Sequence, residues 1–262
     1  MMFDKKNVVF IPNIDLGNTR NLSYQYSIQS WEKWCKKNDI ELFVWNTLLF
    51  PVKECKITWQ RHYCLSILKE NNIEFDQVAV VDADTIICLD TPNFFNETNN
   101  QFCGVLNDGC YEWTNRSIKQ YGNSLFSGWE RPKIWEYING GFLVYNITHQ
   151  GLFNNLLQTY WQHKHAFIKA QEIFKVGTDQ TPLNFFLTSL NINVKLLPSC
   201  YNLQDLGRKD LLYIYPNCWW EDSLDNLFNS GFIFHFNCIP PNPLKRDANY
   251  WIKRVYEEMK KD

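Results

Sequence analysis

The sequence has no apolar run long enough to span a bilayer. Its first ten residues, MMFDKKNVVF, contain neither a long apolar stretch nor a small-residue cleavage site. These absences argue against a transmembrane helix and against a cleavable signal peptide. The nine cysteines are scattered and include no CxxC pair, which is not the pattern of a disulfide-rich secreted domain. We therefore expect reduced thiols and a cytoplasmic protein.

The chain also carries little net charge, −2 over 262 residues. A protein that binds nucleic acid through a basic face needs a clear positive excess, so we expect no nucleic-acid partner, although a single nucleotide is still a compatible ligand. Hydrophobic residues make up 45% of the chain and charged residues 21%, an ordinary globular composition. With no internal repeat and no low-complexity linker, we predict a single domain over residues 1–262.

Apolar runs alternate with amphipathic segments along the chain. Residues 8–11 predict a strand, and apolar residues at three- and four-residue steps predict a helix over 22–37. Strands that alternate with helices in this way are typical of an α/β fold, with a mostly parallel central sheet and helices on both faces. Further strands are predicted at 40–45, 78–81, 102–106, 138–146, 194–197 and 232–236, helices at 57–70, 151–163, 179–189 and 247–260, and an irregular segment at 107–133.

One stretch organises the rest of the chain. The apolar run Val78–Val81 predicts a strand buried on both faces, and Asp82-Ala83-Asp84 follows it directly. Ligands bind beyond the carboxyl ends of strands in open α/β sheets. Two carboxylates at such a point are costly without a positive partner, and a divalent cation such as Mg²⁺ or Mn²⁺ supplies one. Alternate residues of an extended strand face opposite sides, so for both side chains to serve one metal either the chain turns at Ala83 or one aspartate binds through water or a sugar hydroxyl.

Six motifs in order give the chain a resemblance to GT-A-fold glycosyltransferases, most closely to the retaining enzymes of glycosyltransferase family 8. They are Arg61-His62-Tyr63-Cys64-Leu65, Val81-Asp82-Ala83-Asp84-Thr85 with Leu89–Phe95, Asn139-Gly140-Gly141, Asp179-Gln180 with Leu183-Asn184, Leu197-Pro198 with Tyr201-Asn202, and His235-Phe236. The resemblance implies one GT-A domain, with a nucleotide-sugar half at 1–106 and, at 107–262, an acceptor half that includes the last metal-ligand strand. It also implies a retaining, hexosyltransferase-type reaction, with a UDP-sugar as donor and a glycan or glycoconjugate as acceptor.

The resemblance further implies roles for particular residues. Asp82, Asp84 and His235 are the expected ligands of Mn²⁺ or Mg²⁺. Asp179 and Gln180 are the expected catalytic pair, on the sugar or acceptor hydroxyls and near the anomeric carbon. The donor would contact Asn13, Asp15, Arg61, Ala83, Asn139, Gly140 and Lys245. Tryptophans in loop-like segments are candidate acceptor platforms, namely Trp113, Trp129 and Trp219.

Each of these roles has a plainer structural alternative. The aspartates also suit turn capping, His235 also suits packing in the core, and Asp179 also suits the first turn of a helix. The family places a glycine and a lysine soon after the histidine, whereas here Lys245 and Arg246 come only after a Pro-rich segment. Two other functions stay open, a haloacid-dehalogenase-type phosphohydrolase and a non-catalytic sugar- or nucleotide-binding relic of the transferase fold.

Overall fold

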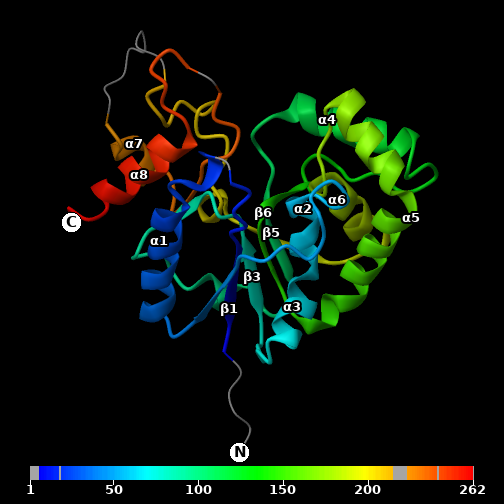
Figure 1. Ribbon diagram of the computed structural model, residues 1–262, viewed down its shortest axis with the longest axis horizontal. Helices are drawn as coiled ribbons and strands as arrows, with labels where there is room; N and C mark the ends of the chain where they lie inside the picture. Colours follow the sequence, from blue (N-terminus) through cyan, green and yellow to red (C-terminus); the bar gives the residue numbers. More distant parts are fainter. Residues whose placement is uncertain (1–5, 18, 215–222, 241, 262) are drawn as a thin grey trace, which may run out of the picture.

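The structure is a computed structural model that describes residues 6–17, 19–214, 223–240 and 242–261 (Figure 1). The strands are β1 Val8–Pro12, β2 Glu41–Trp45, β3 Val78–Val81, β4 Thr85–Ile87, β5 Phe102–Leu106, β6 Ile138–Tyr145, β7 Val194–Leu197 and β8 Ile233–His235. The α-helices are α1 Tyr24–Lys37, α2 Ile57–Gln60, α3 Cys64–Glu70, α4 Tyr111–Asn123, α5 Gln150–Phe174, α6 Gln180–Ser189, α7 Asp225–Phe228 and α8 Ala248–Glu258. Among the short 3₁₀ helices, η1 Thr19–Asn21 and η2 Arg61–Tyr63 contribute to the site below.

Six strands form the central sheet in the order β2-β1-β3-β6-β5-β7. All pair in parallel except β6, which runs antiparallel to both β3 and β5. The sheet is therefore mostly parallel, as predicted. A separate two-stranded sheet joins β4 to β8, and it brings the segment after β3 beside the last strand of the chain.

The alternation of side chains along β3 divides the core in two. Val78 and Val80 belong to the cluster that α3, α5 and α6 cover, whereas Ala79 and Val81 belong to the cluster that α1 and α8 cover. Figure 1 shows α1 and α8 on one side of the sheet and α2, α3, α5 and α6 on the other. Burial on both faces explains why β3 is continuously apolar. The predicted fold class, an α/β sheet with helices on both faces, is confirmed.

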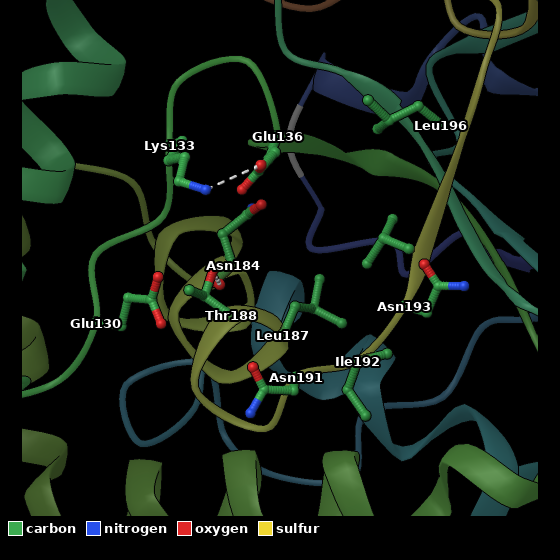
Figure 2. Close-up of a pocket in the computed structure, with 11 residues that line it drawn as sticks. Glu130, Lys133, Glu136, Asn184, Leu187, Thr188, Asn191, Ile192, Asn193 and Leu196 are labelled. Atoms are coloured by element: carbon green, nitrogen blue, oxygen red, sulfur yellow. Dashed lines mark hydrogen bonds and ion pairs between the residues drawn. The ribbon is translucent and has the colours of Figure 1, made fainter.

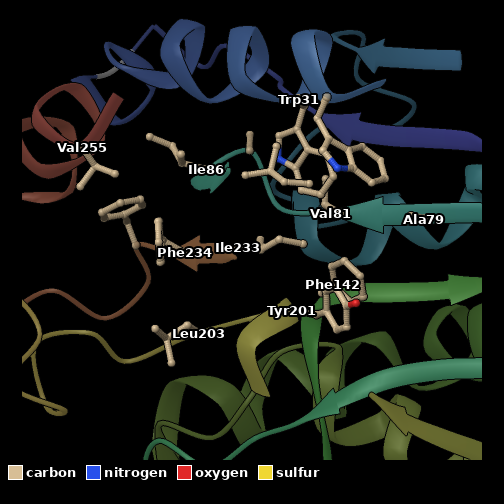
Figure 3. Close-up of a cluster of buried hydrophobic side chains, with 14 of the residues drawn as sticks. Trp31, Ala79, Val81, Ile86, Phe142, Tyr201, Leu203, Ile233, Phe234 and Val255 are labelled. Carbon is tan, nitrogen blue, oxygen red and sulfur yellow. The ribbon is translucent and has the colours of Figure 1, made fainter. Parts of the chain in front are cut away.

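The α1 side of the core also encloses the small sheet. In Figure 3, Ile86 of β4 and Phe234 of β8 lie between Trp31 of α1 and Val255 of α8. Trp31 is fully buried, and its indole Nε1 donates a hydrogen bond to Thr85 Oγ1 at 2.9 Å. The hydrophobic packing of α1 thereby holds the start of β4 in place.

Residues 107–133 are not irregular throughout, as the sequence pattern suggested, because α4 occupies 111–123. The buried positions of α4 do recur at helical spacing, but they include Thr114, Ser117 and Gly122 beside Ile118 and Tyr121. Because small polar residues form much of the inward face, the helix shows no clear apolar stripe.

Two further boundaries differ from the prediction. The helix expected to end at residue 163 continues as α5 to Phe174, with non-helical backbone dihedrals at His163. The helix expected over 57–70 is divided by η2 into α2 and α3. Despite the length of α5, none of the helices in the described ranges combines the length and apolarity needed to cross a membrane.

Candidate active site

A turn after β3 brings the two aspartates to the same side. The chain leaves β3 at Val81, turns at Ala83 and enters β4 at Thr85. The carbonyl of Asp82 accepts a hydrogen bond from Thr85 Oγ1 at 2.7 Å, and its backbone N–H donates to the carbonyl of Gly141 at 3.0 Å. The expected turn at Ala83 is therefore present, and it removes the geometric obstacle to shared ligation.

His235 completes a cluster with these aspartates. In the β4–β8 ladder His235 pairs with Thr85, next to the turn. Its Nε2 lies 3.4 Å from Asp84 Oδ1 and 3.6 Å from Asp82 Oδ2, and His235 and Asp84 are both buried. Burial alone raises the pKa of Asp84, but the charge and hydrogen bond of His235 outweigh burial and lower it. Burial lowers the pKa of His235, but the charge and hydrogen bond of Asp84 and the charge of Asp82 together outweigh burial and raise it above its ordinary value.

The cluster fits a hard divalent cation. Carboxylate oxygens with one imidazole nitrogen are a donor set that Mg²⁺ and Mn²⁺ accept, and the three candidate ligand atoms lie within 4.8 Å of one another. Ligands at about 2.1 Å on neighbouring octahedral positions stand about 3 Å apart, close to the observed separations. Gly141 leaves room for this arrangement, since a Cβ there would lie 2.3 Å from His235 Cε1 and 2.9 Å from Asp82 Oδ2.

A buried ion-pair network links the cluster to the start of α6. Arg61 donates from Nη1 to Asp82 Oδ1 at 2.6 Å, and from Nε and Nη2 to Asp179 Oδ2 at 3.0 and 2.6 Å. Asp179 Oδ2 also lies 2.9 Å from His62 Nε2, and Thr178 Oγ1 donates to Asp179 Oδ1 at 2.8 Å. Arg61 therefore fixes one oxygen of Asp82 and leaves the other facing His235.

The charges of this network reinforce one another. Burial would lower the pKa of Arg61, but the carboxylates of Asp179 and Asp82 outweigh burial and raise it. Burial would raise the pKa of Asp179, but Arg61 and His62 hold it well below its usual range. Burial lowers the pKa of His62 despite its bond to Asp179. Asp179 occupies the N-cap of α6, and its side chain makes no capping hydrogen bond because it is engaged by Arg61 and His62.

Gln180 presents an unmatched donor beside this network. Its Oε1 accepts a hydrogen bond from the Gly140 N–H at 2.9 Å, while its Nε2 is buried without a hydrogen-bond partner among the described residues. A buried polar atom without a partner is costly, and a ligand hydroxyl in the adjoining cavity would satisfy it. Gly140 itself must lack a side chain, because a Cβ there would lie 2.5 Å from Arg61 Nη2.

Two cavities meet at the cluster. The smaller, about 160 Å³, lies at the carboxyl end of β1, beside Pro12, Ile14 and Tyr24. The larger, about 350 Å³, extends toward α4 and α6 and is lined by Gln180, Asp179 and Trp113 among others. The two share a set of lining residues, namely Arg20, Thr58, Arg61, Asp82 and Asp84.

Several predicted site residues lie away from this cleft. Asp15 is exposed and accepts a hydrogen bond from the Gly17 N–H at 2.8 Å, as in an Asx turn. Asn13 lines neither cavity, although its Oδ1 is buried without a partner in the part of the chain that the structure describes. Trp129 packs on Phe126 and Phe186 outside the cleft. Lys245 is exposed and lines neither cavity, and Trp219 lies outside the described residues.

Asn139 is engaged deep inside the protein. It is 3% exposed, and both ends of its amide are hydrogen-bonded to other protein groups. Asn139 nevertheless also lines the larger cavity, and Ala83 lines the smaller cavity beside the aspartates.

Sequence reasoning missed Arg20 altogether. This residue of η1 lies at the junction of the two cavities, where its positive charge acts on both Asp82 and Asp84. It also donates from Nε to the hydroxyl of Tyr24 at 3.1 Å. Nothing in the local sequence distinguishes it from a solvated arginine of a turn. Only the folded position of η1 beside the turn after β3 reveals it.

A third cavity, of about 440 Å³, lies apart from the cluster (Figure 2). It is bounded by the last turns of α6, by β7 and by the loop that carries the 3.4 Å ion pair between Lys133 and Glu136. None of the proposed metal ligands lines it. The chemistry described above therefore belongs to the cleft at the carboxyl end of β3.

Comparisons with known proteins place the fold. The sequence matches no protein-family profile and no curated protein. One similar solved structure is a glycosyltransferase involved in the glycosylation of the major capsid of PBCV-1, with TM-score 0.57, 8% identity and coverage of 98% of this chain and 100% of that one. A weaker likeness is to mouse xyloside xylosyltransferase 1 in its apo form, with TM-score 0.46, 12% identity and coverage of 91% and 99%. At such identity the first likeness shows a shared fold, in agreement with the GT-A fold expected from the motifs.

Proposed function

We propose that this protein is a metal-dependent glycosyltransferase that moves a sugar from a nucleotide sugar, a UDP-sugar by preference, to a hydroxyl of a glycan or glycoconjugate. The observation that carries the proposal is the Asp82, Asp84 and His235 cluster at the junction of two cavities. One cavity provides room for a nucleotide and the other for a sugar and its acceptor. The fold shared with a glycosyltransferase agrees with this proposal, as an analogy.

The donor would lie across the junction. Its nucleoside would occupy the smaller cavity at the end of β1, and its diphosphate would lie over the aspartates. Mn²⁺ or Mg²⁺, held by Asp82, Asp84 and His235, would neutralise the charge that develops on the leaving diphosphate. Arg20 lines both cavities and its charge acts on both aspartates, so it is placed to contribute charge to the diphosphate, while Arg61 is held by two carboxylates. It takes the role for which the family uses a lysine after the histidine.

The sugar would lie between the cluster and α6. There the free Nε2–H of Gln180 would donate to the donor sugar, and the absence of side chains at Gly140 and Gly141 permits close approach to the backbone. Asp179 is a poor general base, because both of its oxygens are hydrogen-bonded and its pKa is held low. We therefore assign it the positioning of Arg61 rather than proton transfer.

We propose that the transfer retains the configuration at the anomeric carbon, as in the retaining enzymes that the motifs resemble. The acceptor hydroxyl would attack the anomeric carbon on the side from which the diphosphate leaves. The bond from that carbon to the phosphate oxygen breaks, the bond to the acceptor oxygen forms, and a phosphate oxygen of the leaving group takes the hydroxyl proton. Trp113, on α4 at the wall of the larger cavity, would offer a ring on which the acceptor stacks.

The deciding experiment is a panel of nucleotide sugars incubated with the protein and Mn²⁺, scored for hydrolysis or transfer. We expect turnover of one UDP-sugar with retention, read by NMR of the product, and loss of metal-linked donor binding in Asp84→Asn with the fold intact. Unchanged turnover in that variant would remove the metal role. Phosphate release from simple monoesters without turnover of any nucleotide sugar would favour the phosphohydrolase. Nucleotide binding without any turnover would favour the relic.

A further inference from the structure

Four buried amide side chains form a hydrogen-bonded network that reaches His235 at Nδ1, the ring nitrogen other than the one that faces the aspartates. They come from three segments, since two of them lie close together after β7, and each is at most 5% exposed: Asn107, Asn139, Asn202 and Gln204. Asn202 Oδ1 lies 3.1 Å from His235 Nδ1, and Asn202 Nδ2 lies 3.1 Å from Asn139 Oδ1. Buried amides that bond to one another orient one another, because each end can act only as a donor or only as an acceptor.

A backbone donor sets the direction of this chain of bonds. The Gly141 N–H lies 2.8 Å from one end of the Asn139 amide, and a backbone N–H can only donate. That end of Asn139 must therefore be its oxygen. The Asn202 atom that faces the same oxygen must be its nitrogen, which leaves the Asn202 oxygen toward His235.

A backbone acceptor sets the same direction from the opposite end. Gln204 Nε2 donates to the carbonyl of Leu106 at 2.8 Å, so the other end of the Gln204 amide is its oxygen. This oxygen accepts from Asn139 Nδ2, as does Asn107 Oδ1 at 3.0 Å. The two ends of the network therefore agree on the orientation of Asn139, and with it on that of Asn202.

We infer that Asn202 is a positioning residue for the metal site, because its oxygen accepts the Nδ1–H of His235 and so leaves the lone pair of Nε2 directed at Asp82 and Asp84. The inference rests on the proposed function for its metal, but the assignment of the ring proton holds with or without a bound cation. Outer partners of this kind fix the tautomer and the ring orientation of a ligating histidine. Gly141 takes part twice, since its N–H orients the network and its missing Cβ leaves space for the ring.

The first test needs no metal. Long-range ¹H–¹⁵N spectra of the metal-free protein at alkaline pH show which ring nitrogen carries the proton, and the His235 signals are identified by their loss in His235→Gln. We expect the proton on Nδ1 and a bare Nε2. A proton on Nε2 with a bare Nδ1 would overturn the inference, whatever the protein does with nucleotide sugars.

The second test links the network to metal affinity through Mn²⁺ titrations followed by electron paramagnetic resonance. Loss of such a partner typically weakens metal binding by about 10- to 100-fold, which we expect for Asn202→Ala together with a mixture of ring tautomers. Asn202→Asp keeps an acceptor and should retain the Nδ1–H form. Asn146→Ala is the matched control, because Asn146 is also a buried, hydrogen-bonded amide but lies past the far end of β6.

The outcomes distinguish the positioning role of Asn202 from the proposed metal-dependent function. Wild-type Mn²⁺ affinity in Asn202→Ala, or an equal loss in Asn146→Ala, would refute the positioning role. If the wild-type protein binds no Mn²⁺, the metal-dependent function is wrong, and the tautomer spectrum still decides the orientation of His235.

Discussion

Replacing Gly141 with alanine should destroy metal binding while preserving the fold. The added Cβ would stand 2.3 Å from His235 Cε1, whereas ordinary contact begins at 3.4 Å. The ring must therefore retreat by about 1.1 Å, because Gly141 cannot move easily within β6, where its carbonyl accepts from Asp82 N–H. Metal–ligand distances tolerate deviations of only about 0.2 Å. The displaced ring can no longer share a cation with the aspartates.

The expected magnitude follows from the loss of one ligand among three. We expect Mn²⁺ affinity to fall by at least about 100-fold, the upper end of what loss of an outer partner causes. Overpacking should also reduce the free energy of unfolding by about 1–3 kcal/mol. Mn²⁺ titration measures the first quantity, and urea unfolding of the metal-free protein measures the second.

Gly104→Ala provides a matched control in the same sheet. Its Cβ would meet Ile138 Cδ1 at 2.8 Å, so it also overpacks the core, but it approaches no proposed ligand. It should lose stability and keep its Mn²⁺ affinity. The reasoning fails if Gly141→Ala binds Mn²⁺ as tightly as the wild-type protein, or if both variants lose the metal equally.

Three further predictions test other parts of the cleft. Arg20→Gln should weaken UDP binding by about 10-fold, as expected for loss of one charge-assisted contact, whereas Lys245→Gln, at an exposed position, should not. Calorimetric titration of both variants with UDP decides between the two cations. Equal effects would contradict the choice of Arg20 as the diphosphate contact. The pKa of Asp179 is lowered in the folded protein, so its charged form stabilises the fold above the unfolded pKa of about 3.9, and this contribution is lost as the pH falls toward the folded pKa. The free energy of unfolding should therefore fall less between pH 7 and pH 3 in Asp179→Asn than in the wild-type protein. An equal pH dependence of the unfolding free energy in the two proteins would refute the ion-pair account. Trp113→Ala should raise the KM for the acceptor while donor hydrolysis stays within about twofold, and the reverse pattern would move Trp113 to the donor side.

The ion-pair network explains why Asp179 and Arg61 work as a unit. Removing one partner of a buried pair leaves an unpaired charge and typically costs about 3–5 kcal/mol. Asp179→Asn is therefore expected to disturb Asp82 through Arg61 even though Asp179 does not touch the cluster. A defect in metal binding in that variant would be a consequence of positioning rather than of lost catalysis.

Much of the architecture could be predicted from local sequence. β3 and α1 were found because burial imposes a period on their own residues, continuous apolar for β3 and three- to four-residue steps for α1. The turn at Ala83 was one of two ways in which both carboxylates could serve one cation, the other being a link through water or a sugar hydroxyl, and the structure contains the turn. By contrast, α4 was missed because its inward face includes threonine, serine and glycine. No local signal marks β6 as the antiparallel strand, because direction depends on its neighbours.

The sequence by itself determined which residues form the candidate metal cluster, namely two aspartates after a buried strand and a histidine at the end of another. Only the tertiary structure decided which groups act on one another. It paired Arg61 with Asp179, 118 residues away, and placed Asn202 at Nδ1 of His235, 33 residues away. It also put Arg20, rather than Lys245, at the junction of the cavities. Periodicity reports whether a residue faces the core, whereas the partner it meets there depends on how distant segments pack together.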